Sequence, residues 1–112
     1  MVGSWVPDRA ILTPVGIEFV RGLRGKLIAV SALRCDGNDA SAPVSSVDAL
    51  RLSADRAAVV CASVKRLGGI RAPTEIVGHG ASHPIASNAT EARRARNRRV
   101  EVELTHRADT VY

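Results

Sequence analysis

The sequence predicts a single α/β domain of the two-layer α+β kind, in which helices pack on one mixed sheet. The chain has 112 residues, which is enough for one hydrophobic core and not for two. Apolar runs alternate with amphipathic helical stretches, and the expected order of elements is β-α-β-α-β-α-β. Because only 3% of the residues are aromatic, the core must be built from Val, Leu, Ile and Ala. We expect residues 1–112 to form one domain, with a core at 6–104 and flexible termini.

The first half of the chain predicts a helix followed by a buried strand. Residues 5–12 contain a proline and suit an edge strand or an extended leading segment. Thr13 and Pro14 make a typical helix start, a capping hydroxyl followed by proline at the first helical position. Residues 27–33 (LIAVSAL) form an almost continuous apolar run, which predicts a central strand covered on both faces. Residues 35–49 are rich in Asp, Asn, Ser and Pro and predict a long loop.

The second half predicts two more helices and two more strands. Ser53 is a suitable N-cap for a long amphipathic helix, which the glycine pair at 68–69 ends. A short strand is expected around residues 75–77, and a third helix over 88–98. Residues 100–104 (VEVEL) alternate apolar and acidic side chains, as a half-buried strand does.

The two cysteines, Cys35 and Cys61, are too few for a disulfide scaffold. Cys61 lies in an apolar helical stretch, where we expect a buried free thiol. A Cys35–Cys61 disulfide is the alternative.

Positive charge is concentrated in one segment. The chain has 16 Lys and Arg against 11 Asp and Glu, a net charge of +5, and residues 90–100 hold five arginines and one glutamate. Such a run raises the alternative of nucleic-acid binding through an arginine-rich helix. At 100° per residue, however, the arginines spread around the whole helix axis, and no aromatic residues are interleaved to stack on bases. Arg94 and Arg98 share a face and are expected to act as a structural pair. We therefore predict no nucleic-acid partner.

Arg56 is the most informative single residue. With Ser53 as N-cap, Arg56 lies in the first helical turn, where a cation faces the positive end of the helix dipole. A cation in that place indicates an anionic partner, which the free N–H groups of the same turn would also favour. An ion pair with a local carboxylate, such as Asp55 or Asp48, is the alternative.

No constellation of residues indicates catalysis. His79 and His83 lie in a turn without a third ligand at suitable spacing, so we predict no metal site. No Ser–His–Asp or Cys–His arrangement and no convergent pair of carboxylates is visible. We therefore expect no enzyme activity and no cofactor.

A series of spaced motifs covers the C-terminal half and the second helix. The pattern G-x-G, P-x-x-x-N-x-T and R-x-x-N-R-R-V-E is filled by Gly78, Gly80, Pro84, Asn88, Thr90, Arg94, Asn97, Arg98, Arg99, Val100 and Glu101. The pattern L-S-x-x-R-A-x-x-V is filled by Leu52, Ser53, Arg56, Ala57 and Val60. These motifs resemble the signature of OmpA-like domains, the family of the peptidoglycan-associated lipoprotein and the flagellar stator protein MotB.

The resemblance implies a βαβαβ-type domain that binds the peptidoglycan stem peptide noncovalently. The usual ligand is diaminopimelate, whose zwitterionic end needs a guanidinium for its carboxylate and a carboxylate for its ammonium. The family arginine corresponds to Arg56. The family aspartate, from a G-H-T-D or G-Y-T-D motif, corresponds best to Asp36 of residues 33–36 (LRCD), with Asp39 as the second choice. Arg94, Asn97 and Arg98 are expected to support the site. A scaffold or protein-interaction domain that has lost the ligand is the alternative.

The same resemblance implies a place in the cell envelope. No apolar run approaches the ~20 residues that cross a bilayer, so no membrane span is expected in this chain. We expect an extracytoplasmic domain, facing the periplasm, the outer membrane or the cell wall, whose export signal or anchor lies elsewhere in a longer protein. The expected partner is peptidoglycan, and homodimerisation stays open.

Overall fold

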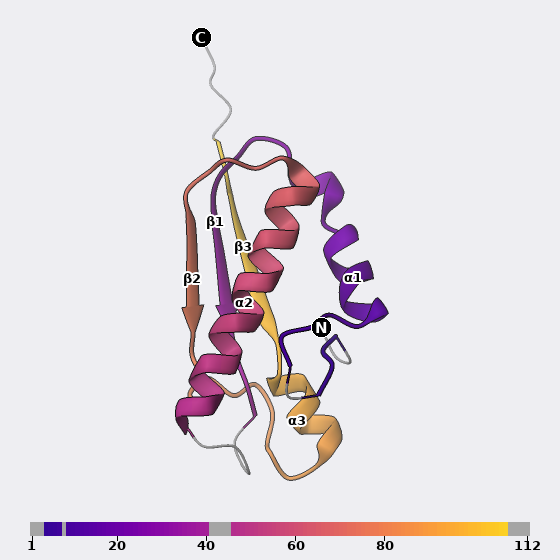
Figure 1. Ribbon diagram of the computed structural model, residues 1–112, viewed down its shortest axis with the longest axis vertical. Helices are drawn as coiled ribbons and strands as arrows, with labels where there is room; N and C mark the ends of the chain where they lie inside the picture. The colour runs from indigo at the N-terminus through magenta and orange to yellow at the C-terminus, as the bar shows by residue number, and fades with distance from the viewer. Residues whose placement is uncertain (1–3, 8, 41–45, 108–112) are drawn as a thin grey trace.

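The computed structural model describes residues 4–7, 9–40 and 46–107. Along the chain it contains α1 (Pro14–Arg21), the 3-10 turn η1 (Arg24–Lys26), β1 (Val30–Gly37), α2 (Ser46–Gly68), β2 (Thr74–Gly78), α3 (Glu91–Asn97) and β3 (Val100–His106). Figure 1 shows α2 lying along the sheet, α1 beside α2, and α3 at one end of the molecule.

The sheet is mixed and has β1 at its centre. The strand order is β2-β1-β3, with β1 parallel to β2 and antiparallel to β3. Cys35 of β1 lies between Ile76 of β2 and Val102 of β3. The α+β architecture predicted from the sequence, a single mixed sheet with helices packed on it, is confirmed.

Of the two expectations for residues 5–12, an edge strand or an extended leading segment, the edge strand is wrong. In the described part of this segment, Trp5 and Leu12 form an isolated antiparallel bridge, and a turn at Pro7 lies between them in the sequence. Pro7 lies in that turn and has no N–H to offer to a neighbouring strand. The helix start at Thr13 is confirmed, since Thr13 caps α1 and Pro14 is its first residue.

The central strand lies further along the chain than its apolar run suggests. Residues 27–29 complete the turn after η1, and Ala29 has a φ of +59°, which no strand residue adopts. In β1 the buried side chains alternate with outward ones: Leu33 and Cys35 face α2, whereas Arg34 and Asp36 lie on the other face. Among the described residues only one face of β1 is covered by a helix, so the prediction of a strand covered on both faces is wrong.

The second helix begins at Ser46, well before the predicted N-cap at Ser53. Ala49, Leu50 and Leu52 are good helix formers and continue the helix backwards. The Ser53 hydroxyl donates to the Leu50 carbonyl at 2.9 Å and accepts from the Gly80 N–H at 2.9 Å. It therefore joins the turn after β2 to α2. Of the loop predicted for residues 35–49, the segment 41–45 lies outside the described residues.

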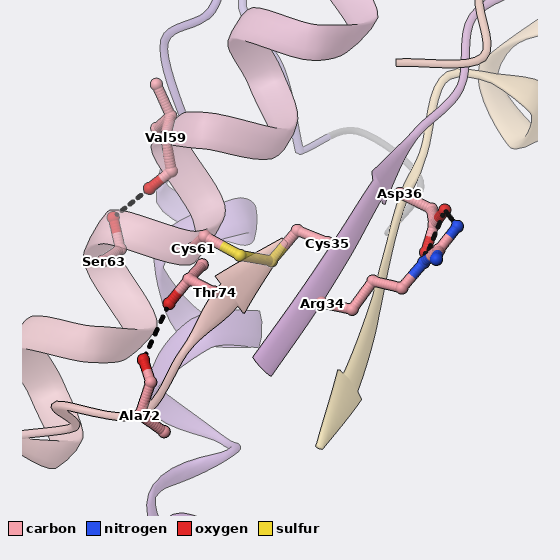
Figure 2. The surroundings of a disulfide bond; sticks show 8 residues. All are labelled: Arg34, Cys35, Asp36, Val59, Cys61, Ser63, Ala72 and Thr74. Carbon is pink, nitrogen blue, oxygen red and sulfur yellow. Dashed lines mark hydrogen bonds and ion pairs between the residues drawn. A yellow bond between two sulfur atoms is a disulfide. The ribbon is translucent and has the colours of Figure 1, made fainter. Parts of the chain in front are cut away.

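The core lies between β1 and α2 and contains a disulfide. Leu33, Val60 and Val64 are at most 2% exposed. Cys35 and Cys61 are bonded to each other, with Cα atoms 6.0 Å apart, and Figure 2 shows the bond joining β1 to α2. The expected free thiol at Cys61 is therefore wrong. The helical stripe that carries Cys61 faces the side of β1 that carries Cys35, which brings the two sulfur atoms together.

Gly37, at the end of β1, allows α2 to approach the sheet. A Cβ at this position would lie 1.8 Å from the Ser53 carbonyl oxygen, a backbone atom that cannot move without displacing α2. We expect Gly37→Ala to lower the free energy of unfolding by about 1–3 kcal/mol or more, as measured by urea titration. Gly25→Ala is the matched control, because nothing lies within 4 Å of a Cβ at Gly25. Equal stability of the two variants would contradict this packing.

None of the described helices is long and apolar enough to cross a membrane.

Candidate functional site

The candidate site lies where β1 and β2 end beside α2. Beyond Gly37 the ladder continues for two residues: Asn38 exchanges backbone hydrogen bonds with Arg99 at 2.8 and 3.2 Å, and the Asp39 N–H donates to the Gly80 carbonyl at 2.7 Å. Because side chains alternate along an extended segment, Asp39 follows Cys35 and Gly37 on the side of α2. Asp39 thus lies in the layer between the sheet and α2.

The Asp39 carboxylate is held in a defined position at the end of β1. Its residue is 6% exposed, and Oδ1 accepts from the Ala40 N–H at 2.8 Å. This hydrogen bond orients the carboxylate at the end of β1.

Arg56 is buried on α2. It is 2% exposed, its Nε donates to the Arg9 carbonyl at 3.1 Å, and its Nη2 donates to the Val6 carbonyl at 3.4 Å. The guanidinium carbon lies 5.2 Å from the centroid of the Trp5 ring, within range of a cation–π interaction. Trp5, Val6 and Arg9 therefore contact the guanidinium.

The position of Arg56 in α2 changes the argument about the helix dipole. Since α2 begins at Ser46, Arg56 lies beyond the first turn and does not oppose the N-terminal partial charge. The dipole argument for an anionic partner of Arg56 is therefore wrong. What remains is a buried guanidinium hydrogen-bonded to two neutral carbonyls and lying over an indole ring.

Asp36 lies on the other face of β1. Its carboxylate accepts from Arg34 Nε at 2.9 Å and from Arg34 Nη2 at 2.9 Å, and Oδ1 lies 2.7 Å from His79 Nε2. Figure 2 shows Arg34 and Asp36 pointing away from the disulfide and α2. The side-chain alternation that turns Cys35 toward α2 turns Asp36 away, so the structure does not bring Asp36 and Arg56 together.

The partners of Asp36 make its contribution to the stability of the fold depend on pH. Its pKa is lowered, first by the hydrogen bonds from Arg34 and then by the one from His79, while partial burial opposes the shift. A carboxyl whose folded pKa lies below its unfolded value stabilises the fold above the unfolded pKa, and this contribution is lost as pH falls through the folded pKa. Below about pH 4 the wild type should therefore lose stability more steeply than Asp36→Asn. Acid titrations followed by circular dichroism check this, and parallel curves would contradict it.

Asn97 organises the loop before α3. It is fully buried, its Oδ1 accepts from the N–H groups of Ile85 and Ala86 at 2.8 and 3.0 Å, and its Nδ2 donates to Asn88 Oδ1 at 3.0 Å. Arg94 Nη1 donates to the Asn88 carbonyl at 2.9 Å. The structure thus gives Asn97 and Arg94 a supporting place in the fold, in contact with the loop before α3.

The arginine run is largely paired with carboxylates. Arg94 and Arg98 both contact Glu91, at 3.2 and 2.6 Å, which confirms their shared face. The pKa of Glu91 is lowered, chiefly by its hydrogen bond from Arg98. Arg99 pairs with Glu101 at 3.0 Å.

Sequence reasoning missed the contacts that two residues of this region make. His79, which follows β2, contacts Asp36 of β1, and its ring lies 4.4 Å from that of His83. No local pattern in the sequence predicts the contact between His79 and Asp36. Trp5 covers Arg56, and the scarcity of aromatic residues in the chain was a signal that could have singled it out. Within the described residues no group of three His, Cys, Asp or Glu side chains is placed to hold a metal ion.

Solved structures similar to this chain include proteins of the bacterial envelope. The peptidoglycan-associated lipoprotein from Burkholderia pseudomallei matches with a TM-score of 0.78 and 23% identity over 91% of this chain and 87% of that protein. The cell wall anchor of the type VI secretion system from Pseudomonas aeruginosa matches with a TM-score of 0.75 and 23% identity over 92% of this chain and 75% of that protein. A MotB-like protein from Desulfovibrio vulgaris matches with a TM-score of 0.71 and 26% identity over 92% of this chain and 69% of that protein.

Comparisons at the level of sequence give nothing further. A scan against models of known protein families finds no match to this chain, and a search of the curated proteins finds none. The motifs at residues 78–101, the mixed sheet with α2 packed on it and the likeness to these solved structures agree with one another. The chain therefore shares its fold with these three solved structures.

Proposed function

We propose that this domain binds peptidoglycan noncovalently and anchors a larger envelope protein to the cell wall. Its fold is shared with one protein named as peptidoglycan-associated and another named as a cell wall anchor. The observation that supports the proposal is that a guanidinium, Arg56, is buried on α2 and a carboxylate, Asp39, is buried where the chain leaves β1.

The proposed ligand is the zwitterionic end of the diaminopimelate side chain. Arg56 would take its carboxylate and Asp39 its ammonium group. A ligand carboxylate at Arg56 replaces the neutral carbonyls of Val6 and Arg9, and a hydrogen bond to a charged acceptor is about twice as strong. Asp36 is less suited to hold the ammonium, because it lies on the face of β1 that points away from α2, the helix that carries Arg56.

The disulfide supports an extracytoplasmic location. Disulfides persist in secreted and periplasmic proteins and are rare in the reducing cytosol. The bond between Cys35 and Cys61 therefore agrees with a domain that works outside the cytoplasmic membrane. We propose a role in binding without catalysis, and no nucleic-acid role for α3, since Arg94, Arg98 and Arg99 pair with carboxylates.

Sedimentation with purified diaminopimelate-type sacculi tests the proposal. Wild-type protein should sediment with the sacculi, whereas Arg56→Ala should stay in the supernatant. Arg51→Ala is the matched control, because Arg51 belongs to the same helix and is exposed. If the wild type stays in the supernatant, wall binding is excluded and a scaffold role takes its place.

A further inference from the structure

A cluster of positive side chains lies at the end of the molecule opposite α3. The turn after α1, the end of α2, the start of β2 and the end of β3 meet there (Figure 1). We call residues 22–31, 65–73 and 105–107 the basic end. These ranges contain no Asp or Glu and six cationic side chains, Arg24, Lys26, Lys65, Arg66, Arg71 and Arg107.

Arg94, Arg98 and Arg99 around α3 pair with carboxylates, whereas none of these six cations pairs with a carboxylate of the described residues. All the ion pairs between described residues involve other arginines or His79. Five of the six are exposed, and Lys65 is half-buried. The sequence analysis found the excess charge in the arginine run, and the structure adds a second group of cations at the basic end that form no ion pair with described residues.

Helix electrostatics explains only part of this cluster. Lys65 and Arg66 lie in the last turn of α2, where cations stabilise the negative end of the helix dipole. Arg24 and Lys26 belong to η1, and Arg71 and Arg107 lie in connecting segments. Neither the fold nor an ion pair requires cations at these four positions.

The basic end also carries an exposed apolar side chain. Ile28 is 79% exposed, the highest value among the large hydrophobic residues of the described chain. It follows Lys26 closely and precedes Ala29, whose φ of +59° costs about 1–2 kcal/mol for a residue with a side chain. The Ala29 carbonyl accepts from the Arg107 N–H at 2.8 Å, and His106 Nε2 lies 2.6 Å from the Lys26 carbonyl, so the turn is fixed against β3.

Exposed cations around an exposed aliphatic side chain fit the surface of an anionic bilayer. The cations meet lipid phosphates, and the aliphatic group enters the boundary between headgroups and acyl chains. A pocket of about 540 Å³, lined by residues that include Ala29, Arg71 and Arg107, lies beside Ile28 and could receive a headgroup. A soluble polyanion would use the cations and gain nothing from Ile28.

We propose that the basic end docks on a bilayer surface that contains anionic lipid. The candidate wall site lies toward the other end, near the start of α2 and α3 (Figure 1). A chain docked in this way presents that end away from the lipid. The docking surface is independent of the ligand proposed for Arg56.

Flotation with lipid vesicles tests this proposal on the whole chain. Wild-type protein should float with phosphatidylcholine vesicles that contain phosphatidylglycerol and not with pure phosphatidylcholine, and added salt should weaken binding. At about 1 kcal/mol per cation, the double variant Lys26→Ala/Arg71→Ala should bind about thirtyfold more weakly. Ile28→Ser should lose about tenfold.

The matched control is Arg93→Ala/Arg96→Ala, which also removes two exposed arginines, but from α3. It should bind the anionic vesicles like the wild type, and circular dichroism should show that all variants are folded. Equal binding to neutral vesicles, or an equal loss in the α3 control, would overturn the proposal. So would unchanged binding of Ile28→Ser together with full competition by soluble polyphosphate, which would indicate a general polyanion surface.

Discussion

Replacing Cys35 and Cys61 together by alanine is expected to lower the free energy of unfolding by about 3 kcal/mol. The disulfide closes a loop with a sequence separation of 26 residues, and restricting a loop of this length in the unfolded chain stabilises the fold by roughly that amount. For a domain of about this size the corresponding fall in melting temperature is roughly 15 °C. Both cysteines are at most 1% exposed, so the double variant removes a bond from the centre of the core.

Urea titrations of the oxidised wild type, the reduced wild type and the double variant measure this effect. The reduced protein should resemble the double variant, and reductant should act slowly on the folded protein because both sulfur atoms are buried. Two thiols that react rapidly in the native protein would contradict the disulfide. A double variant as stable as the oxidised wild type would contradict its role in stability.

Loss of the Arg56 guanidinium is expected to weaken diaminopimelate binding by about a hundredfold. Hydrogen bonds to charged groups contribute about 1.5–3 kcal/mol, and the guanidinium would lose its bonds to the ligand carboxylate. Arg56→Ala also removes the contacts with Trp5, Val6 and Arg9, so stability has to be separated from affinity. Arg56→Lys serves this purpose, because it keeps the charge and loses the planar fork.

Arg56→Lys should stay folded and bind about tenfold more weakly than the wild type. Isothermal titration with diaminopimelic acid gives the affinities, and thermal unfolding gives the stability of each variant. If Arg56→Lys and Arg56→Ala both bind diaminopimelic acid with the affinity of the wild type, the ligand does not contact this side chain.

Local signals predicted most of the elements. The Thr13–Pro14 pair starts α1, and the alternation of residues 100–104 marks β3, because these features depend only on neighbours in the chain. Ser53 misled the prediction of α2. It has the chemistry of an N-cap, but its hydroxyl bonds to Gly80, which is distant in the sequence, and no local pattern reveals such a contact.

The candidate site was predictable in part. The motif around Arg56 located a buried guanidinium. The choice of Asp36 depended on a motif match, which does not tell on which face of the sheet a side chain lies. The disulfide identifies the face of β1 that points to α2, because Cys35 is bonded to Cys61 of that helix. Since side chains alternate along the chain, Asp36 points away from α2, whereas Asp39 can point toward it. The basic end was hidden because its cations come from three separate stretches of sequence that meet only in the fold.

The pair of variants Asp39→Asn and Asp36→Asn tests the proposed wall-binding site most directly. Both remove one carboxylate charge and keep the shape of the side chain, but the two residues lie on opposite sides of β1. In titrations with diaminopimelic acid, we expect the wild type and Asp36→Asn to bind alike and Asp39→Asn to lose measurable binding. Full binding by Asp39→Asn, or its loss in Asp36→Asn alone, would contradict the assignment of the ammonium group to the layer between β1 and α2.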